Sequence, residues 1–363
     1  MHIPDGYLSP ATCAALYAGA APFWYVALRR VRRAMHTRLV PVLSLVGAFS
    51  FVVMMFNIPL PGGTTGHAAG LAVATVMVGP LASMLAVSIA LVIQAFFFGD
   101  GGITAIGANC FNIAIVGSLV AHVVYRALSG RAALSSRLRP VAAAIAGYVA
   151  INAAALSTAL QLGIQPLLYR DAAGAPLYAP YPIGIAVPAM MIGHVTVAGL
   201  AEALLSWGVV AFVQRSDPSL LRLNAAHAAA IEAPVGSVRA LRPLWLALAL
   251  LMLLTPLGIL ATGTAWGEWG ASDFATAEGR QEIAAATLEH APPARAPAGL
   301  ERLSSAWTAP WADYAPPFVR SPAVGYVLSA MFGVGLVVLL SWALGLGVSC
   351  WRGRAPAAPK GTQ

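Results

Sequence analysis

Long apolar runs separated by short polar segments are the main pattern of this chain. Eight runs are long enough to cross about 30 Å of hydrocarbon as helices: residues 10–28, 39–56, 81–98, 105–125, 140–162, 185–213, 244–261 and 323–349. A ninth run, 67–78, is shorter and stops at Gly79-Pro80, where proline ends or kinks a helix. The pattern predicts an all-α polytopic membrane protein.

Composition agrees with this prediction and excludes other classes. Of the 363 residues, 59% are hydrophobic and only 9% are charged, whereas about a quarter of the residues in soluble domains are charged. The formal net charge of +8 comes from arginines that cluster between the apolar runs, as basic residues do in cytoplasmic loops. We therefore expect contact with a lipid bilayer and no nucleic-acid binding.

The arginines also predict the orientation of the chain. If the segment 67–98 crosses the membrane twice, 16 of the 21 basic residues fall on one side, in the tail and in the loops 29–38, 126–139 and 215–242. The more positive side is cytoplasmic. The N-terminus then faces outward from a bacterial inner (plasma) membrane, together with three loops: 57–66, 99–104 and 262–322.

A change of composition after the seventh helix divides the chain. We predict a seven-helix core in residues 1–213, a polar cytoplasmic connector in 214–243, a two-helix hairpin in 244–349 and a cytoplasmic tail in 350–363. The hairpin encloses a long external loop. Tryptophans near the two ends of this loop are typical of an interfacial belt: Trp266, Trp269, Trp307 and Trp311.

The opening residues, MHIPDG, carry the first candidate site. No Lys or Arg precedes Arg29, so we expect no signal peptide and expect Met1 to stay in the mature chain. The free amine of Met1, the amide nitrogen of His2 and the His2 imidazole can close adjacent five- and six-membered chelate rings around one metal ion. Pro4 adds no competing amide N–H and stiffens the turn at Asp5-Gly6. The alternative is an ordinary solvated histidine.

A second candidate ligand follows the glycine-rich stretch NIPLPGGTTGHAAG, residues 57–70. Non-helical backbone at the membrane edge is tolerated only where protein buries it or where it lines a cavity. We expect His67 to be the first residue of a helix on the same face as His2, where it could donate a fourth nitrogen. Tetragonal nitrogen coordination suits Ni(II) or Cu(II), and Co(II) more loosely. A helix cap or an interfacial histidine is the alternative.

The third outward stretch is GDGGITAIGANCFNIAIVG, residues 99–117. Asp100 or Asn109 could accept a hydrogen bond from the imidazole N–H that the metal leaves free, which fixes the orientation of a ligating ring. Asn57, at the start of the second stretch, is a further candidate for such support. A simple tight turn at Gly-Asp-Gly-Gly is the alternative.

Three separated motifs together resemble one family. MHIPDGYLSP, FNIPLPGGTTGH and GDGGITAIGANCFNIA look like the CbiM/NikM family, the substrate-binding membrane subunits of energy-coupling-factor (ECF) transporters for cobalt and nickel. The resemblance covers about residues 1–213, and the family's metal ligands map to Met1, His2 and His67. The hairpin is similar in layout, and in its TAWGEWG stretch, to the small CbiN/NikN subunit, here fused.

The resemblance also implies cargo and partners. It implies import of Ni(II) for nickel enzymes or of Co(II) for cobalamin synthesis, within an ABC-type complex. The implied partners are a CbiQ/NikQ-like coupling subunit and a CbiO/NikO-like ATPase. The only lysine is Lys360, so the chain has no GxxxxGK[ST] phosphate loop and is not expected to be an enzyme itself. Because the mapped ligands all precede residue 68, we expect the hairpin to be dispensable for metal binding.

Another pair of ionisable residues supports rival interpretations. His194 and Glu202 lie eight residues apart on one predicted helix and therefore on roughly one face. Ionisable residues within a membrane span are functional candidates by default. They could belong to a membrane metalloenzyme or to a secondary transporter that works alone, although their spacing is not that of HExxH. The simpler alternative is that they form a structural pair inside the bundle.

Overall fold

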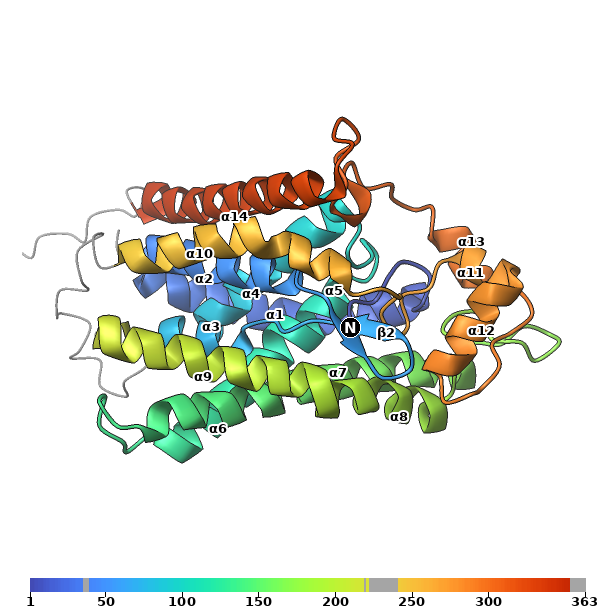
Figure 1. The fold of residues 1–363 in the computed structure, drawn as a ribbon, viewed down its shortest axis with the longest axis horizontal. Helices are drawn as coiled ribbons and strands as arrows, with labels where there is room; N and C mark the ends of the chain where they lie inside the picture. The colour runs from blue at the N-terminus through green and yellow to red at the C-terminus, as the bar shows by residue number, and fades with distance from the viewer. Residues whose placement is uncertain (35–38, 219, 222–240, 353–363) are drawn as a thin grey trace, which may run out of the picture.

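The structure is a computed structural model that describes residues 1–34, 39–218, 220–221 and 241–352. It is a bundle of helices elongated along one axis (Figure 1). Within these residues seven helical stretches are long and apolar enough to cross a membrane: Pro10–Val31, Pro80–Phe98, Ile106–Ser129, Leu138–Leu168, Ile183–Ser216, Arg242–Leu260 and Pro322–Leu346. A shorter apolar helix, Val40–Met54, lies among them. The predicted class, a polytopic helical membrane protein, is confirmed.

The first part of the chain forms the expected seven-helix core. Its helices are α1 (Pro10–Ala34), α2 (Leu39–Met54), α3 (Leu71–Val78), α4 (Pro80–Ile93), α5 (Ile106–Asn109) with α6 (Ser118–Ser129), α7 (Leu138–Leu168), and α8 (Ile183–Gly193) with α9 (Gly199–Ser216). Three π-helical segments interrupt them: η1 (Gln94–Phe98) ends α4, η2 (Cys110–Gly117) joins α5 to α6, and η3 (His194–Ala198) joins α8 to α9. Such segments are frequent at functional sites.

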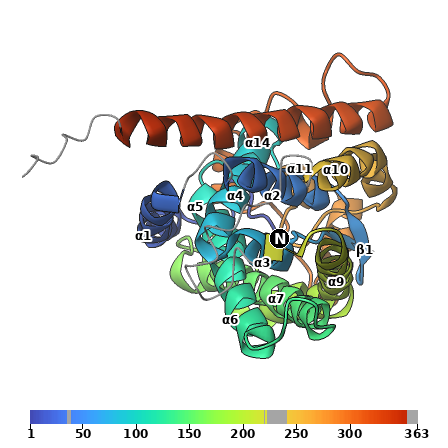
Figure 2. The same cartoon turned by 90° about the vertical axis from the view of Figure 1, so that its left-hand side faces the viewer.

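Helix α7 is the central packing element of one half of the core. It packs against α6, α8 and α9, and the view along the bundle shows it between α6 and α9 (Figure 2). Its buried face consists largely of small residues, among them Ala143, Gly147, Ala150 and Ala154. Small side chains let helices approach closely in lipid. Figure 2 also places the N-terminus in the middle of the bundle.

The segment 67–98, predicted to cross the membrane twice, differs from the prediction at its start. Residues 58–66 form a two-stranded antiparallel hairpin, β1 (Ile58–Leu60) and β2 (Thr64–Gly66). His67 is not the first residue of a helix, because α3 begins at Leu71, after a left-handed Gly70 with φ of 69°. With eight residues, α3 is only about 12 Å long. Residues 67–70, which precede α3, are non-helical backbone buried by the surrounding protein.

The arginine-bearing ends of several helices lie together. Arg126 is in the last turn of α6, Arg215 is in the last turn of α9, and Arg242 begins α10 (Arg242–Leu254). Figure 1 shows these ends at the left of the bundle, whereas β2 and the N-terminus lie on the right. These described helix ends, which border loops predicted to lie on one side, are therefore at one end of the bundle.

The remaining helices form the expected hairpin, and it is docked on the core. Helix α10 (Arg242–Leu254) continues in a 3-10 segment, η7 (Thr255–Leu260), and α14 (Pro322–Arg352) returns. Between them lie four short helices: α11 (Ala271–Ala275), α12 (Ala277–Ala286), α13 (Ala298–Leu303) and η8 (Ala312–Tyr314). Helix α14 packs on α2 and α4, and α10 packs on α2. The long loop is thus a folded cap (residues 262–321) at the N-terminal end of the bundle (Figure 1).

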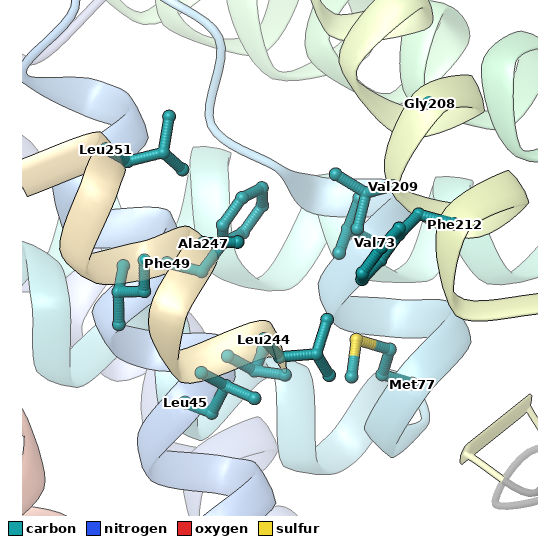
Figure 3. Close-up of a pocket in the computed structure, with 12 residues that line it drawn as sticks. Leu45, Phe49, Val73, Met77, Gly208, Val209, Phe212, Leu244, Ala247 and Leu251 are labelled. Atoms are coloured by element: carbon teal, nitrogen blue, oxygen red, sulfur yellow. The ribbon is translucent and has the colours of Figure 1, made fainter. Parts of the chain in front are cut away.

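An apolar cavity of about 210 Å³ lies between α10 and the core. Leu45 and Phe49 of α2, Met77 of α3, Phe212 of α9 and Leu244 of α10 are among the residues that line it (Figure 3). None of the described residues that line it is ionisable. This cavity is therefore not a site for a metal ion.

Two of the four tryptophans predicted to form an interfacial belt are buried instead. Trp266 and Trp269 are only 6% and 4% exposed, and their rings pack edge to face. The hydroxyl of Tyr7 donates to the carbonyl of Trp269 (2.8 Å). Trp307 is 43% exposed, and its indole N–H donates to the carbonyl of Phe96. The first pair is buried because the N-terminal loop and the cap close over it.

Candidate metal centre

The first residues of the chain are buried, not solvated. Met1 and His2 are each 2% exposed. The Pro-Asp-Gly turn fixes them, because the Asp5 carboxylate accepts the backbone N–H groups of Ile103 (3.0 Å) and Thr104 (2.8 Å) and the Thr104 hydroxyl. Gly6 has φ of +90°, and a Cβ there would lie 2.6 Å from the α-carbon of Leu300. The N-terminal loop is therefore clamped between the third outward stretch and the cap.

Asn109 holds the backbone next to the candidate chelate. Its Oδ1 accepts from the N–H of Ile3 (2.7 Å), and its Nδ2 donates to the carbonyl of Ile3 (3.1 Å). The same carbonyl accepts from the N–H of Gly102 (2.8 Å). Asn109 thus supports the main chain of the residue after His2. The prediction that Asn109 accepts a hydrogen bond from an imidazole is therefore wrong.

Asp100 instead contacts the imidazole of His2. Its Oδ1 lies 2.7 Å from Nδ1 of His2, and its Oδ2 accepts from the hydroxyl of Tyr314 (2.6 Å) and from Nε2 of Gln94 (3.2 Å). The contact uses the ring nitrogen that a six-membered chelate ring would need. Asp100 therefore holds His2 in place through the ligating nitrogen itself.

His67 faces His2 across a small gap. The side chain is 5% exposed, and the two imidazole rings stack with their centroids 5.0 Å apart and their planes 25° apart. Nδ1 of His67 lies 3.1 Å from the carbonyl oxygen of Ala68. A carbonyl only accepts, so Nδ1 carries the proton of a neutral ring, and Nε2 carries the lone pair. The Nε2 atoms of His2 and His67 are both buried without a hydrogen-bond partner.

The terminal amine is held by the cap. The Met1 amine lies 3.0 Å from Oε1 of Glu268. A backbone bridge between Thr65 of β2 and Ala265 also joins the cap to the core, three residues before Glu268. The sequence analysis missed Glu268 and Tyr314. For Glu268 the sequence did contain a signal, because in TAWGEWG this acidic residue stands between two tryptophans. The structure shows that both tryptophans are buried.

One pocket of about 290 Å³ is lined by His2, His67 and Asp100 together with Glu268 and Tyr314 of the cap. Asn57 lies on its wall with His2 and His67, as do three acidic residues: Asp100, Glu268 and Asp313. No lysine or arginine is among the described residues that line it. A cavity bordered by carboxylates and containing imidazole nitrogens is suited to a divalent cation.

Electrostatics keep the two central groups in useful protonation states. Burial lowers the pKa of His67 well below its ordinary value, and the positive charges of His2 and the terminal amine lower it further. Burial alone would raise the pKa of Asp100, but the charge and hydrogen bond of His2, with contributions from His67 and Tyr314, bring it below its ordinary value. At neutral pH His67 is thus a neutral imidazole whose Nε2 can offer its lone pair to a metal ion, and Asp100 is ionised.

His194 and Glu202 do not form a pair. Nδ1 of His194 lies 2.9 Å from the carbonyl oxygen of Met190, whereas the Glu202 carboxylate binds the backbone of residues 69–71. In the part of the chain that the structure describes, no three His, Cys, Asp or Glu side chains converge as a metal site would require. A metal centre made of side chains alone is therefore not present there, and the candidate set depends on the terminal amine and amide.

Comparison with known families now identifies the chain. Residues 2–220 match CbiM, the cobalt uptake substrate-specific transmembrane region, and residues 242–349 match the PDGLE domain. The chain belongs to the CbiM family. This CbiM-family chain carries its PDGLE domain in the same polypeptide, and the expected resemblance is confirmed.

Relatives with the same arrangement match over most of their length. A fused nickel transport protein NikMN of Rhodobacter capsulatus is 54% identical over 338 residues, 93% of this chain and 95% of that protein. A probable fused nickel transport protein LarMN of Lactiplantibacillus plantarum is 40% identical over 94% of this chain and 96% of its own length. A cobalt transport protein CbiM of Geobacter sulfurreducens is 32% identical over 61% of each chain.

Solved structures agree with the fold. A crystal structure of a truncated transition metal transporter superposes with a TM-score of 0.56 and 47% sequence identity, covering 59% of this chain and 99% of that one. This CbiM-family chain is a multi-pass membrane protein of a transporter family.

Proposed function

We propose that this chain captures Ni(II) or Co(II) at the outer face of a bacterial inner membrane and delivers it inward as the substrate-specificity subunit of an ECF-type transporter. The observation that carries the proposal is the buried Nε2 atom of His67, which has no hydrogen-bond partner and lies in a ring stacked on the imidazole of His2. A buried, unsatisfied polar atom costs about 1–3 kcal/mol. A cation that enters this carboxylate-bordered pocket would give Nε2 of His67 a partner.

Four nitrogens are available to that cation. They are the Met1 amine, the His2 amide, Nδ1 of His2 and Nε2 of His67. The first three close one five-membered and one six-membered ring, which favours a planar arrangement, and tetragonal nitrogen sets suit Ni(II). Two relatives that share the fused architecture are named as nickel transport proteins. We therefore propose nickel as the first cargo and cobalt as its competitor.

Loading exchanges carboxylate partners for metal. Nδ1 of His2 rests against Asp100, and the Met1 amine rests against Glu268. Both nitrogens must leave these carboxylates to bind the ion, and the amine and amide must release protons. The two acidic groups, together with Asp313, draw a divalent cation into the pocket before the exchange.

The transporter assignment implies a division of labour. Residues 1–213 form the metal-binding core, 244–349 form the hairpin, and 214–243 and 350–363 lie in the cytoplasm. Because the chain has no phosphate-binding loop, ATP hydrolysis belongs to a CbiO/NikO-like subunit, coupled through a CbiQ/NikQ-like subunit. The imported metal supplies nickel enzymes or cobalamin synthesis.

Metal analysis of the full-length chain tests the proposal. Protein purified without added metal is measured for Ni and Co by mass spectrometry, and Ni(II) and Co(II) then compete for it. We expect one ion per chain, and we expect tight binding to be lost in His67→Ala but not in His122→Ala, a partly exposed histidine of α6. Undiminished binding by His67→Ala would show that the pocket is not the site. Uptake by the purified chain alone in vesicles would instead favour a stand-alone secondary transporter.

A further inference from the structure

Glu202 is a fully buried carboxylate in the first turn of α9. It is 0% exposed and accepts three hydrogen bonds from consecutive backbone N–H groups: those of Ala69 (2.8 Å), Gly70 (2.9 Å) and Leu71 (2.7 Å). None of the described basic side chains forms an ion pair with it. An ionisable group within a membrane span is costly and is rarely kept without a role.

The three N–H groups belong to the start of α3. A helix leaves its first N–H groups without internal partners, and α3 has no side-chain cap of its own. Its cap position is occupied by Gly70 in the left-handed conformation, and a Cβ there would lie 2.7 Å from the ring of Phe49. A serine or aspartate cannot occupy this position, so the acceptor comes from another helix.

The surrounding core is shaped to admit Glu202. Gly147 of α7 faces it, and a Cβ at Gly147 would lie 3.2 Å from Cγ of Glu202 and 2.6 Å from Oγ of Ser206. The absence of a side chain at Gly147 therefore leaves the room in which the carboxylate reaches α3. A carboxylate has about four lone-pair sites and can serve several N–H groups at once, which a hydroxyl cannot.

The capped segment adjoins the proposed metal ligand His67. The ring of His67 is oriented by the carbonyl of Ala68, and Ala68 directly precedes the first N–H group that Glu202 holds. We propose that Glu202 is the positioning residue for His67: it fixes residues 69–71, and through them it aims Nε2 of His67 into the pocket. This inference rests on the proposed function, because it concerns how the same site is held.

The test uses full-length protein and Ni(II). Glu202→Gln keeps the shape but replaces one acceptor oxygen by an NH₂ group, which cannot receive a backbone N–H. We expect its affinity for Ni(II) to fall by about 10- to 100-fold, as when groups that orient metal ligands are removed. Its ligand-field absorption spectrum should match that of His67→Ala, because the terminal chelate remains while the fourth nitrogen is lost. Ser206→Ala, one turn along the same helix and equally buried, is the matched control and should bind as the unaltered chain does.

A double variant separates positioning from general damage. If Glu202 acts through His67, then Glu202→Gln combined with His67→Ala binds Ni(II) no more weakly than His67→Ala alone, since the two changes remove one contribution. Glu202→Asp retains a carboxylate and should restore part of the affinity; it also serves as the test variant if the glutamine form does not insert. Unaltered affinity and spectrum in both Glu202 variants, or multiplying losses in the double variant, would overturn the inference. Normal binding by His67→Ala would instead overturn the proposed function.

Discussion

The terminal amine of Met1 lies 3.0 Å from Oε1 of Glu268, a residue 267 positions further along the chain. A second contact of this kind joins the hydroxyl of Tyr314 to the carboxylate of Asp100. Both contacts connect the cap to groups that touch the candidate chelate. The hairpin therefore forms part of the wall around the metal pocket and is more than an appended module.

Deletion of residues 244–363 is expected to weaken Ni(II) binding, contrary to the expectation from ligand positions alone. The truncated core loses Glu268, Tyr314 and the packing of the cap against Gly6. Loss of such supporting groups typically lowers metal affinity by about 10- to 100-fold. Isothermal titration of the truncated and full-length chains checks this. Tyr314→Phe should reproduce part of the loss, whereas Tyr326→Phe, on the same pocket wall, should not.

Any residue added before Met1 is expected to abolish metal uptake. The amine moves away from the pocket, His2 becomes the third residue, and the buried terminus, 2% exposed at Met1, has no room for an extension. The measurement is Ni(II) and Co(II) uptake by cells that also make the ATPase and coupling subunits. A tag at the C-terminus is the control. Normal uptake by the N-terminally extended chain would eliminate the terminal chelate.

Metal-free His67→Ala is expected to be as stable as the unaltered chain, or more stable. The substitution removes a buried Nε2 that lacks a partner, and this offsets the packing that is lost, because an unsatisfied polar atom costs about 1–3 kcal/mol. Thermal unfolding in detergent with a chelator present measures the effect. A large fall in Tm would mean that His67 is mainly a structural residue.

Affinity for Ni(II) is expected to fall as the pH is lowered, because protons compete for the ligand nitrogens. Burial and nearby positive charge lower the pKa of His67. Its ring therefore stays neutral at about pH 6.5, the ordinary pKa of histidine, and protons compete with the metal for this ring only at lower pH. Above about pH 6.5, His67→Ala should weaken binding without changing its pH slope. Titrations of both chains at several pH values compare the slopes, and a shallower slope in the variant would contradict this assignment.

The sequence predicts the helices well, because long apolar runs and clustered arginines report directly on the membrane. It places the start of α3 wrongly. The apolar pattern continues to His67, but the helix cannot, since Gly70 is left-handed and the carboxylate that holds the first N–H groups lies 131 to 133 residues away. A cap supplied over that distance leaves no local pattern.

In the candidate site, too, some residues can be predicted from the sequence and others cannot. Met1, His2 and His67 are recognisable from local spacing, and the structure brings His2 and His67 into ring contact. The partners Glu268 and Tyr314 are not recognisable, because their contacts depend on how the cap folds over the N-terminal loop. Trp266 and Trp269 were misassigned for the same reason, since burial by a distant segment cannot be inferred from an aromatic residue near a membrane edge.

The pocket joins His2 and Pro4, near the start of the chain, to residues between positions 263 and 326. During synthesis the N-terminus leaves the ribosome long before Glu268 and Tyr314 are made, so the enclosed pocket cannot exist until most of the chain has been translated and the last hairpin has been inserted. Completion of the site is therefore a late event in biogenesis. Fusion of the two parts in one polypeptide also ensures that every core receives one cap, whatever the expression level of the gene.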